Sequence, residues 1–355
     1  MDIHDLLTEA TKKRASDLHI TANYHPVLRI DGELVPQVNQ PLVSPEDLEQ
    51  MISSITNEEQ KKRFENELEL DFACDIKELG RFRANACLQR GNISLCFRLL
   101  QVKVPEIEEL GLPDICKDLA LKERGFIIVC GPTGSGKSTT LAALIKHINN
   151  LKKRRIITIE DPIEFLHENK NCFITQRELG TDTLSFGTAL KHALRQDPDV
   201  IMVGEMRDLE TISIALTAAE TGHLILTTLH TPSAPQTIDR IIDIFPPYQQ
   251  PQVRVQLSTT LEGVLYQALI PKAQGAGRVL AMEVMIASDA IRNLIREGKT
   301  AHMWNVMQTG AQFGMQTLDQ ALMNLLHNRQ INFEEAISHC RDAETFKKSL
   351  GRPLK

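Results

Sequence analysis

A glycine-rich segment, GPTGSGKS at residues 131–138, lies between a short apolar run and a stretch with helical spacing. It fits the pattern G-x-x-x-x-G-K-[ST], in which backbone N–H groups close around phosphate oxygens and a helix N-terminus adds a favourable dipole. The lysine of this pattern neutralises the β and γ phosphates, and the hydroxyl after it ligates magnesium. A chance glycine-rich turn is the alternative, and the strand and helix context disfavours it. We therefore expect ATP and Mg²⁺ as cofactors, with the metal on Ser138, in a site formed by Gly131, Pro132, Thr133, Gly134, Ser135, Gly136, Lys137, Ser138 and Thr139.

Carboxylates follow two further apolar runs. In PDVIMVGEMRD, Glu205 comes just after a strand, where its carboxylate can orient or deprotonate the water that attacks a γ phosphate. A surface acid at a strand end is the alternative, and the phosphate loop favours the catalytic role. In IITIEDPIEF, the second acidic group (Glu160, Asp161 and Glu164) suits phosphoryl transfer, with a structural turn held by Asp161 as its alternative.

Two histidines lie at the two ends of one predicted strand in the segment TGHLILTTLHT. The strand between His223 and His230 holds them more than about 20 Å apart, so they cannot share a metal ion. A histidine at a strand end is usually structural. The neighbouring motifs give His230 the alternative role of sensing the nucleotide.

Three arginines lie on two adjacent strands in RFRANACLQRGNISLCFRLL. Strand alternation places Arg81 and Arg83 on one face, and Arg98 lies on the hairpin partner strand. Solvated surface arginines are the ordinary interpretation. The alternative is a cation supplied in trans to the γ phosphate of a neighbouring subunit.

The elements that must position these residues fall into three parts. Short strands and a helix capped by Ser44 precede residue 100, and one hairpin turn lies near Arg90, Gly91 and Asn92. Apolar strands then alternate with helices, which predicts a parallel sheet covered on both faces. Only helical spacing follows residue 285. We expect an α+β domain at 1–100, a linker at 101–115, an α/β core at 116–285 and a helical region at 286–355.

Composition sets limits on class and partners. A chain of 355 residues predicts two domains, and a formal charge of −6 gives no overall attraction to nucleic acid or anionic lipid. The first residues contain early acids and no long apolar run, so we expect neither a signal peptide nor a membrane span, and hence the cytoplasm. The seven cysteines include no C-x-x-C pair, which favours reduced core thiols over a zinc site.

Taken together, four segments resemble the signature boxes of the secretion and type IV pilus ATPases. GPTGSGKS, IEDPIEF, DPDVIMVGEMRD and TGHLILTTLHT are similar to their Walker A, Asp, Walker B and His boxes, and ASDLHI and RIDG are similar to their N-terminal domain. The resemblance runs from about Ala15 to Ala336. AIRNLIREGK at 290–299 matches a motif that marks the PilT-type retraction ATPases. The assembly ATPases usually carry a longer N-terminal region and a tetracysteine zinc insert, neither of which is present, and the PilU-type paralogues lack the AIRNLIRE pattern.

The resemblance implies a fold, an assembly and a set of roles. It implies an α/β fold with a RecA-like P-loop ATPase core, a PAS-like N-terminal domain and a C-terminal helical region. It also implies a homohexamer that hydrolyses ATP to retract a pilus during twitching motility, at the cytoplasmic face of the inner membrane. The expected partners are the inner-membrane platform protein and a PilU-type paralogue. By position, the catalytic residues are Glu205, Glu164, Arg83 and Arg98, with Glu160 and His230 at the nucleotide and Arg81 a weaker candidate.

Two other functions are compatible with parts of the sequence. One is a PilU-like accessory ATPase that acts mainly as a partner-binding module. The other is a nucleic-acid motor, which the general fold permits but the net acidic charge disfavours.

The AIRNLIREGK segment predicts an amphipathic helix. Ser288 or Asp289 can cap it, and the apolar stripe (Ile291, Leu294 and Ile295) predicts burial against the core. The cations on the other faces are Arg292, Arg296 and Lys299. They are expected to meet an acidic surface such as that of the platform protein, with an ordinary solvated helix face as the alternative.

Overall fold

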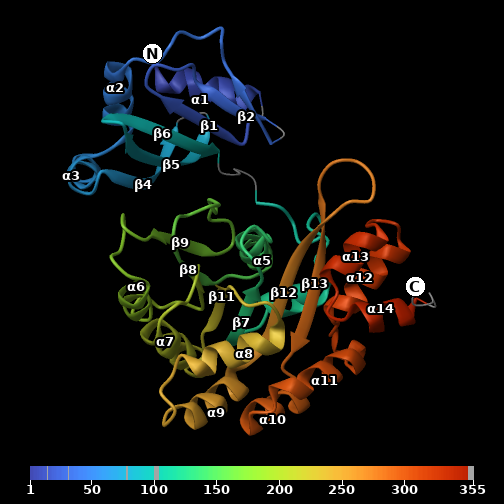
Figure 1. Cartoon of the computed structure of the whole chain (residues 1–355). Helices are drawn as coiled ribbons and strands as arrows, with labels where there is room; N and C mark the ends of the chain where they lie inside the picture. The colour runs from blue at the N-terminus through green and yellow to red at the C-terminus, as the bar shows by residue number, and fades with distance from the viewer. Residues whose placement is uncertain (14, 31, 77–78, 100–103, 351–355) are drawn as a thin grey trace. The chain divides into compact units, whose positions relative to one another are not determined.

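A computed structural model describes residues 1–13, 15–30, 32–76, 79–99 and 104–350. The chain divides into two compact units: Met1–Lys103 with Pro162–Leu166, and Val104–Asp161 with His167–Lys355. Figure 1 shows the elements of each unit along the chain. Most of the expected linker lies in the second unit, and its residues 101–103 lie outside the described residues.

The first unit contains an antiparallel sheet with the strand order β3-β2-β1-β6-β5-β4. Its strands are β1 (Asp17–Thr21), β2 (Val27–Ile30), β3 (Glu33–Pro36), β4 (Glu69–Ile76), β5 (Gly80–Gln89) and β6 (Asn92–Leu99), and its helices are α1 (Ile3–Lys12), α2 (Pro45–Ile55) and α3 (Glu58–Glu67). Helices α1 and α2 contribute apolar side chains to the same core as the buried face of the sheet, including Phe82 and Phe97.

Local signals in this unit behave as the sequence predicts. Ser44 and Asp47 form a capping box at the start of α2. Arg90 and Gly91 both have positive φ and connect β5 to β6, which confirms the expected hairpin turn. Between β2 and β3 the chain carries the turn-forming dipeptide Asp31-Gly32, of which Asp31 lies outside the described residues.

The second unit contains a seven-stranded sheet with the order β13-β12-β7-β11-β10-β8-β9. Its strands are β7 (Gly125–Cys130), β8 (Arg155–Glu160), β9 (Phe173–Glu178), β10 (Val200–Val203), β11 (Leu224–Leu229), β12 (Leu261–Pro271) and β13 (Arg278–Ile286). Its helices are α4 (Ile115–Ala120), α5 (Lys137–Leu151), α6 (Phe186–Ala193), α7 (Leu209–Glu220), α8 (Ala234–Asp243), α9 (Gln250–Thr260), α10 (Asp289–Glu297), α11 (Met303–Thr309), α12 (Leu318–His327), α13 (Phe333–His339) and α14 (Ala343–Ser349), with 3₁₀ turns η1 (Thr300–His302) and η2 (Ala311–Phe313).

Helices cover both faces of this sheet, as expected. Phe126 and Ile128 of β7 face one core cluster, which includes α7 and α8, whereas Ile127 and Val129 face another, which includes α5. Alternating side chains of one central strand therefore contribute to two apolar layers. The expected parallel sheet is present, and one edge strand differs from it, because β13 pairs with β12 in antiparallel register. No helix among the described residues is both long and apolar enough to cross a bilayer.

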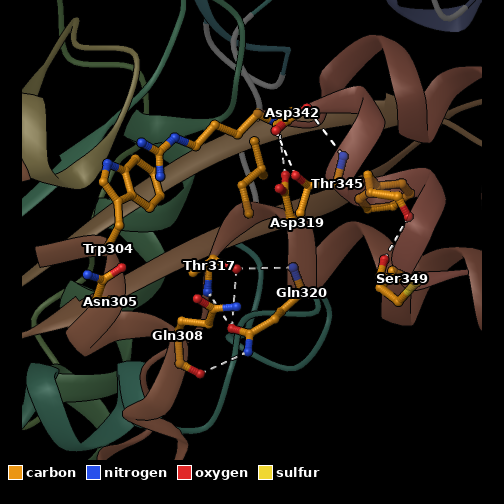
Figure 2. A pocket seen from close by; sticks show the side chains of 13 residues that line it. Trp304, Asn305, Gln308, Thr317, Asp319, Gln320, Asp342, Thr345 and Ser349 are labelled. Carbon is orange, nitrogen blue, oxygen red and sulfur yellow. Dashed lines mark hydrogen bonds between the residues drawn. The ribbon is translucent and has the colours of Figure 1, made fainter. Parts of the chain in front are cut away.

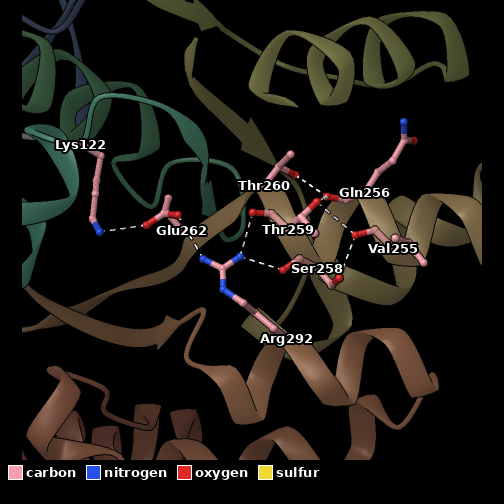
Figure 3. Close-up of polar contacts among 8 residues, drawn as sticks. All are labelled: Lys122, Val255, Gln256, Ser258, Thr259, Thr260, Glu262 and Arg292. Carbon is pink, nitrogen blue, oxygen red and sulfur yellow. Dashed lines mark hydrogen bonds and ion pairs between the residues drawn. The ribbon is translucent and has the colours of Figure 1, made fainter. Parts of the chain in front are cut away.

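Helix α10 has the predicted apolar stripe, but one of its cations, Arg292, makes contacts within the chain. Ser288 caps the helix, and Ile291 and Ile295 are fully buried. Arg292, however, donates hydrogen bonds to the carbonyl oxygens of Ser258 and Thr259 at 2.7 and 3.0 Å, and it pairs with Glu262 at 3.1 Å (Figure 3). Its guanidinium thus satisfies the C-terminal carbonyls of α9, as a cation at a helix C-terminus does. The expectation that Arg292 meets a partner protein is corrected by these internal contacts.

Candidate active site

The phosphate loop connects the end of β7 to the start of α5, as the sequence predicts. Gly131 has φ 145°, and a Cβ atom there would come within 2.5 Å of the Gln267 carbonyl oxygen on β12. Gly136 has φ 89° and directly precedes α5. Both positions require glycine, the first because a neighbouring strand approaches and the second because of the backbone conformation. The sequence thus places a tight loop at the N-terminus of a long helix.

Lys137 is held inside this loop. Its side chain is buried, and Nζ donates to the carbonyl oxygens of Gly131 and Pro132, both at 3.0 Å. A buried ammonium group of this kind requires acceptors, and the loop's own backbone supplies them. Ser138 is exposed at the first turn of α5, where its hydroxyl is available to a ligand. The loop therefore presents a cation, a hydroxyl and a helix N-terminus together, a chemistry that fits a polyphosphate and a magnesium ion.

A cavity of about 390 Å³ brings the phosphate loop together with two other motifs. Thr133 of the loop, Glu205 after β10 and His230 after β11 all contribute to its lining. Since β7, β11 and β10 are neighbouring parallel strands, their carboxyl ends lie at the same edge of the sheet. The sheet order thus explains why residues nearly a hundred positions apart meet in one cavity. The other lining residues are Met206, Arg207, Thr228, Leu229, Thr231, Arg240 and Ile244.

Glu205 shares the lining of this cavity with two cationic side chains, Arg207 and Arg240. Its carboxylate pairs with Arg207 at 2.8 Å, although the Arg207 side chain is mostly exposed. The pKa of His230 lies below its ordinary value, because burial and the positive charges of Lys137 and Arg207 outweigh the effect of Glu205. His230 is therefore a neutral imidazole near pH 7, able to donate one hydrogen bond and accept another. His223, at the other end of β11, contacts the Ala218 carbonyl through Nδ1 at 2.9 Å.

The acidic segment after β8 divides between two settings. Glu160 is buried and its Oε1 accepts hydrogen bonds from Thr158 at 2.6 Å and Gln176 at 3.1 Å. Asp161 is exposed, and Glu164 belongs to the segment that groups with the first unit. The roles of Glu160 and Glu164 at the nucleotide remain predictions.

The three arginines that the sequence analysis singled out (Arg81, Arg83 and Arg98) share the face of the first unit's sheet opposite its core. Arg83 on β5 lies directly across from Arg98 on β6, and both are exposed, whereas Arg81 is half-buried. Within the described part of the chain, Asp17 bonds Arg98 at 2.8 Å and also lies 3.9 Å from Arg29. Burial acts to raise the pKa of Asp17, but hydrogen bonds from Arg98 and Ser16 outweigh it and lower that pKa. Like charges directly opposite each other are unfavourable in a sheet, so this face suits an external anion.

Sequence reasoning missed several residues of the cavity. Thr228 in the middle of the sheet donates its hydroxyl to the Gly204 carbonyl, next to Glu205. Arg240 of α8 adds a second cation to the lining. A signal for Thr228 was present, since adjacent threonines interrupt the apolar strand LILTTL. Within the described ranges, no group of three or more His, Cys, Asp or Glu side chains is arranged to hold a metal ion.

Comparison with known proteins gives a consistent result. The family model described as "Type II/IV secretion system protein" matches residues 1–338. The chain is 49% identical to the type IV pilus retraction ATPase PilT of Pseudomonas aeruginosa, over 98% of this chain and 100% of the relative. It is 42% identical to the type IV pilus ATPase PilU of the same species, over 97% of this chain and 90% of the relative. A crystal structure of the pilus retraction motor PilT with bound ADP superimposes with a TM-score of 0.93 at 46% identity, covering 98% of this chain and 99% of the other.

Proposed function

Because the chain belongs to the type II/IV secretion system protein family, we propose that it is a hexameric motor that hydrolyses ATP to retract type IV pili. The single observation that carries the hydrolytic part is the cavity that joins the phosphate loop, Glu205 and His230. The pilus as the load is supported by the near full-length similarity to a retraction ATPase and by the AIRNLIRE segment of α10.

The phosphate loop and the residues of the adjoining cavity divide the work of phosphoryl transfer. Lys137 and the loop N–H groups hold the β and γ phosphates, and Ser138 is the protein ligand for Mg²⁺, which when bound neutralises charge on the phosphate oxygens. Glu205 orients the attacking water and takes up its proton. The neutral imidazole of His230 hydrogen-bonds on the γ phosphate side and so distinguishes the nucleotide before hydrolysis from the one after it.

Arg83 and Arg98 supply positive charge to the nucleotide of a neighbouring subunit in the proposed hexamer. Two exposed guanidinium groups in direct opposition, with Asp17 as their acidic neighbour, support this role. A γ phosphate placed between the two guanidinium groups would relieve their mutual repulsion. The two guanidinium groups would in turn stabilise the negative charge of the phosphate. In this arrangement the N-terminal domain of one subunit packs on the ATPase core of the next.

The proposed cellular setting is the cytoplasmic face of the inner membrane. There the hexamer would act on the pilus platform protein, together with a PilU-type paralogue where one is present, and would support twitching motility. Similarity to both PilT and PilU supports this setting.

Substitution of Glu205 by glutamine tests the proposal directly. Purified Glu205→Gln should bind ATP normally, assemble as the wild type does by mass photometry, and lose at least about a hundredfold in turnover because the proton acceptor is removed. Glu334→Gln, an exposed acid in the first turn of α13, is the matched control. Unchanged turnover in Glu205→Gln would refute the assigned role. Restoration of twitching in a strain without its own retraction ATPase tests the load.

The accessory alternative is favoured by one observation, the 42% identity to PilU. It predicts that the wild-type chain binds ATP without measurable turnover and restores twitching only when a second retraction ATPase is present.

A further inference from the structure

Glu283 on β13 is a fully buried carboxylate outside the cavity described above. Its Oε1 accepts a hydrogen bond of 2.7 Å from the backbone N–H of Ala234, the first residue of α8. The backbone N–H of Leu318, the first residue of α12, also acts on this carboxylate. The acid thus accepts a hydrogen bond at the N-terminus of α8 and lies near that of α12, where backbone N–H groups lack partners within the helix and favour negative charge, while its Oε2 is buried with no hydrogen-bond partner among the described residues.

The start of α8 is joined to both motifs of the active site. Ala234 lies four positions after His230 in the same segment. In the first turns of α8, the Thr237 hydroxyl contacts that of Thr231 at 2.6 Å and the Cys130 sulfur at 3.2 Å. Thr231 directly follows His230, and Cys130 directly precedes the phosphate loop. A shift of the α8 N-terminus would therefore move both walls of the cavity.

We propose that Glu283 is a positioning residue whose ionised carboxylate fixes the N-terminus of α8, and through it His230 and the phosphate loop, in the geometry that hydrolysis requires. The inference rests on the proposed function, since it assumes that the chain turns over ATP. A negative charge serves this purpose better than a neutral group, because charge-assisted hydrogen bonds to backbone N–H groups are shorter and stronger.

The ionisation of Glu283 falls in the range where cells and assays operate. Burial raises its pKa to about 7, against the lowering effect of the Ala234 and Leu318 N–H groups. Asp319 on α12 raises the pKa of Glu283 further, and Arg341 lowers it. Tyr266 of β12 and Cys130 of β7 are further titratable groups, among the described residues, that interact with it.

Asp319 and Arg341 provide a way to shift this ionisation from a distance. Both line a pocket of about 540 Å³ between the C-terminal helices, shown in Figure 2. Asp319 accepts a hydrogen bond of 2.8 Å from the Arg341 backbone N–H, and the Arg341 guanidinium lies 4.1 Å from the centre of the Trp304 ring. Neither residue contributes to the active-site cavity or to the shift in the His230 pKa.

The test is the pH dependence of kcat for the full-length assembled chain. Wild-type kcat should rise through an ionisation near pH 7, because the charged form of Glu283 is the positioning form. Glu283→Gln keeps the side-chain volume but not the charge. Its kcat should therefore lack the rise near pH 7, called here the pH 7 limb, and should remain roughly tenfold below the wild-type kcat at pH 8. Asp319→Asn should move the limb to lower pH, and Arg341→Gln should move it to higher pH.

Hydrogen exchange at the amides of residues 234–237, corrected for intrinsic rates, reads the same ionisation without turnover. Protection of these amides should increase above pH 7 in the wild type and not in Glu283→Gln. The proposal is overturned if Glu283→Gln retains the wild-type limb, or if neither neighbouring substitution moves it. A wild-type chain that binds ATP without turnover would contradict the proposed function, while the exchange profile would still decide the role of Glu283.

Discussion

The phosphate loop and the arginine face of the N-terminal sheet hold their cations in opposite ways. Lys137 is buried, and two backbone carbonyls 3.0 Å away accept its hydrogen bonds. Arg83 and Arg98 are exposed and lie directly across from each other, with Asp17 beside Arg98. The first cation is positioned by its own loop, whereas the second pair is arranged to meet an anion that comes from outside its sheet.

This difference indicates how the proposed motor divides its chemistry. Nucleotide binding depends on groups that one unit holds in place, so it should survive in any subunit that folds. Acceleration of hydrolysis depends on exposed arginines, so it should require a neighbouring subunit. The following substitutions test this division, from the largest expected effect to the smallest.

Lys137→Ala should have the largest effect, because it removes the buried cation that neutralises the phosphates. We expect turnover to fall at least about a thousandfold, with weakened ATP binding even in dissociated subunits. The measurements are steady-state ATPase activity and nucleotide binding by calorimetry. Lys152→Ala, an exposed lysine at the C-terminal cap of α5, is the matched control. Tight ATP binding by Lys137→Ala would contradict the claim that nucleotide binding depends on the buried cation of the phosphate loop.

Arg98→Gln should reduce turnover by about tenfold to a hundredfold and leave ATP binding unchanged, because its charge acts on a neighbour's nucleotide in the transition state. Mixed hexamers of Arg98→Gln with Glu205→Gln subunits should regain activity at interfaces that combine an intact Arg98 with an intact Glu205. Arg63→Gln, which removes an exposed arginine paired with Glu67, is the control. Mixtures that never exceed the sum of the two parents would show that Arg98 does not act in trans.

Two arginines of α10 show the same contrast between an internally bonded and an exposed cation. Their substitution should have the smallest effect of the series, which is an effect on stability. Arg292 bonds two carbonyls of α9 and Glu262, whereas Arg296 is exposed and makes one long contact of 3.4 Å with Asn293. Arg292→Ala should therefore lower the free energy of unfolding by about 1–3 kcal/mol, and Arg296→Ala by less than about 0.5 kcal/mol. Chemical denaturation measures both. Equal losses would mean that the internal contacts of Arg292 contribute little to stability.

Features set by local spacing could be predicted from the sequence. The phosphate loop, the strand-end position of Glu205, the β5–β6 turn and the Ser288 cap each depend on a few consecutive residues. The partners of Arg292 could not be predicted, because they lie some thirty positions away on α9 and β12 and meet it only after the sheet forms. The antiparallel pairing of β13 could not be predicted for a related reason, since apolar strands of either direction have the same sequence pattern.

The sequence around Glu283 carries a signal of a buried acid that the spacing of the motifs does not reveal. Glu283 is the one acid in the strand RVLAMEVMI, and its neighbours on both sides are apolar. An ionisable residue in such a run predicts a buried partner. Which backbone groups lie near it depends on where α8 and α12 begin beside the sheet, and residue spacing does not predict this.

The antiparallel strand β13 has one further consequence, which concerns where the chain can be shortened. Part of its outer edge is paired, since Val284 and Gln316 exchange two backbone hydrogen bonds at 2.8 and 3.1 Å, and the Gln316 side chain donates to the Met282 carbonyl. Unpaired strand edges template intermolecular pairing. A fragment that stops after β13 would expose this edge and aggregate, so the helices from α10 to α12 protect the motor domain in addition to any contact they make with partners.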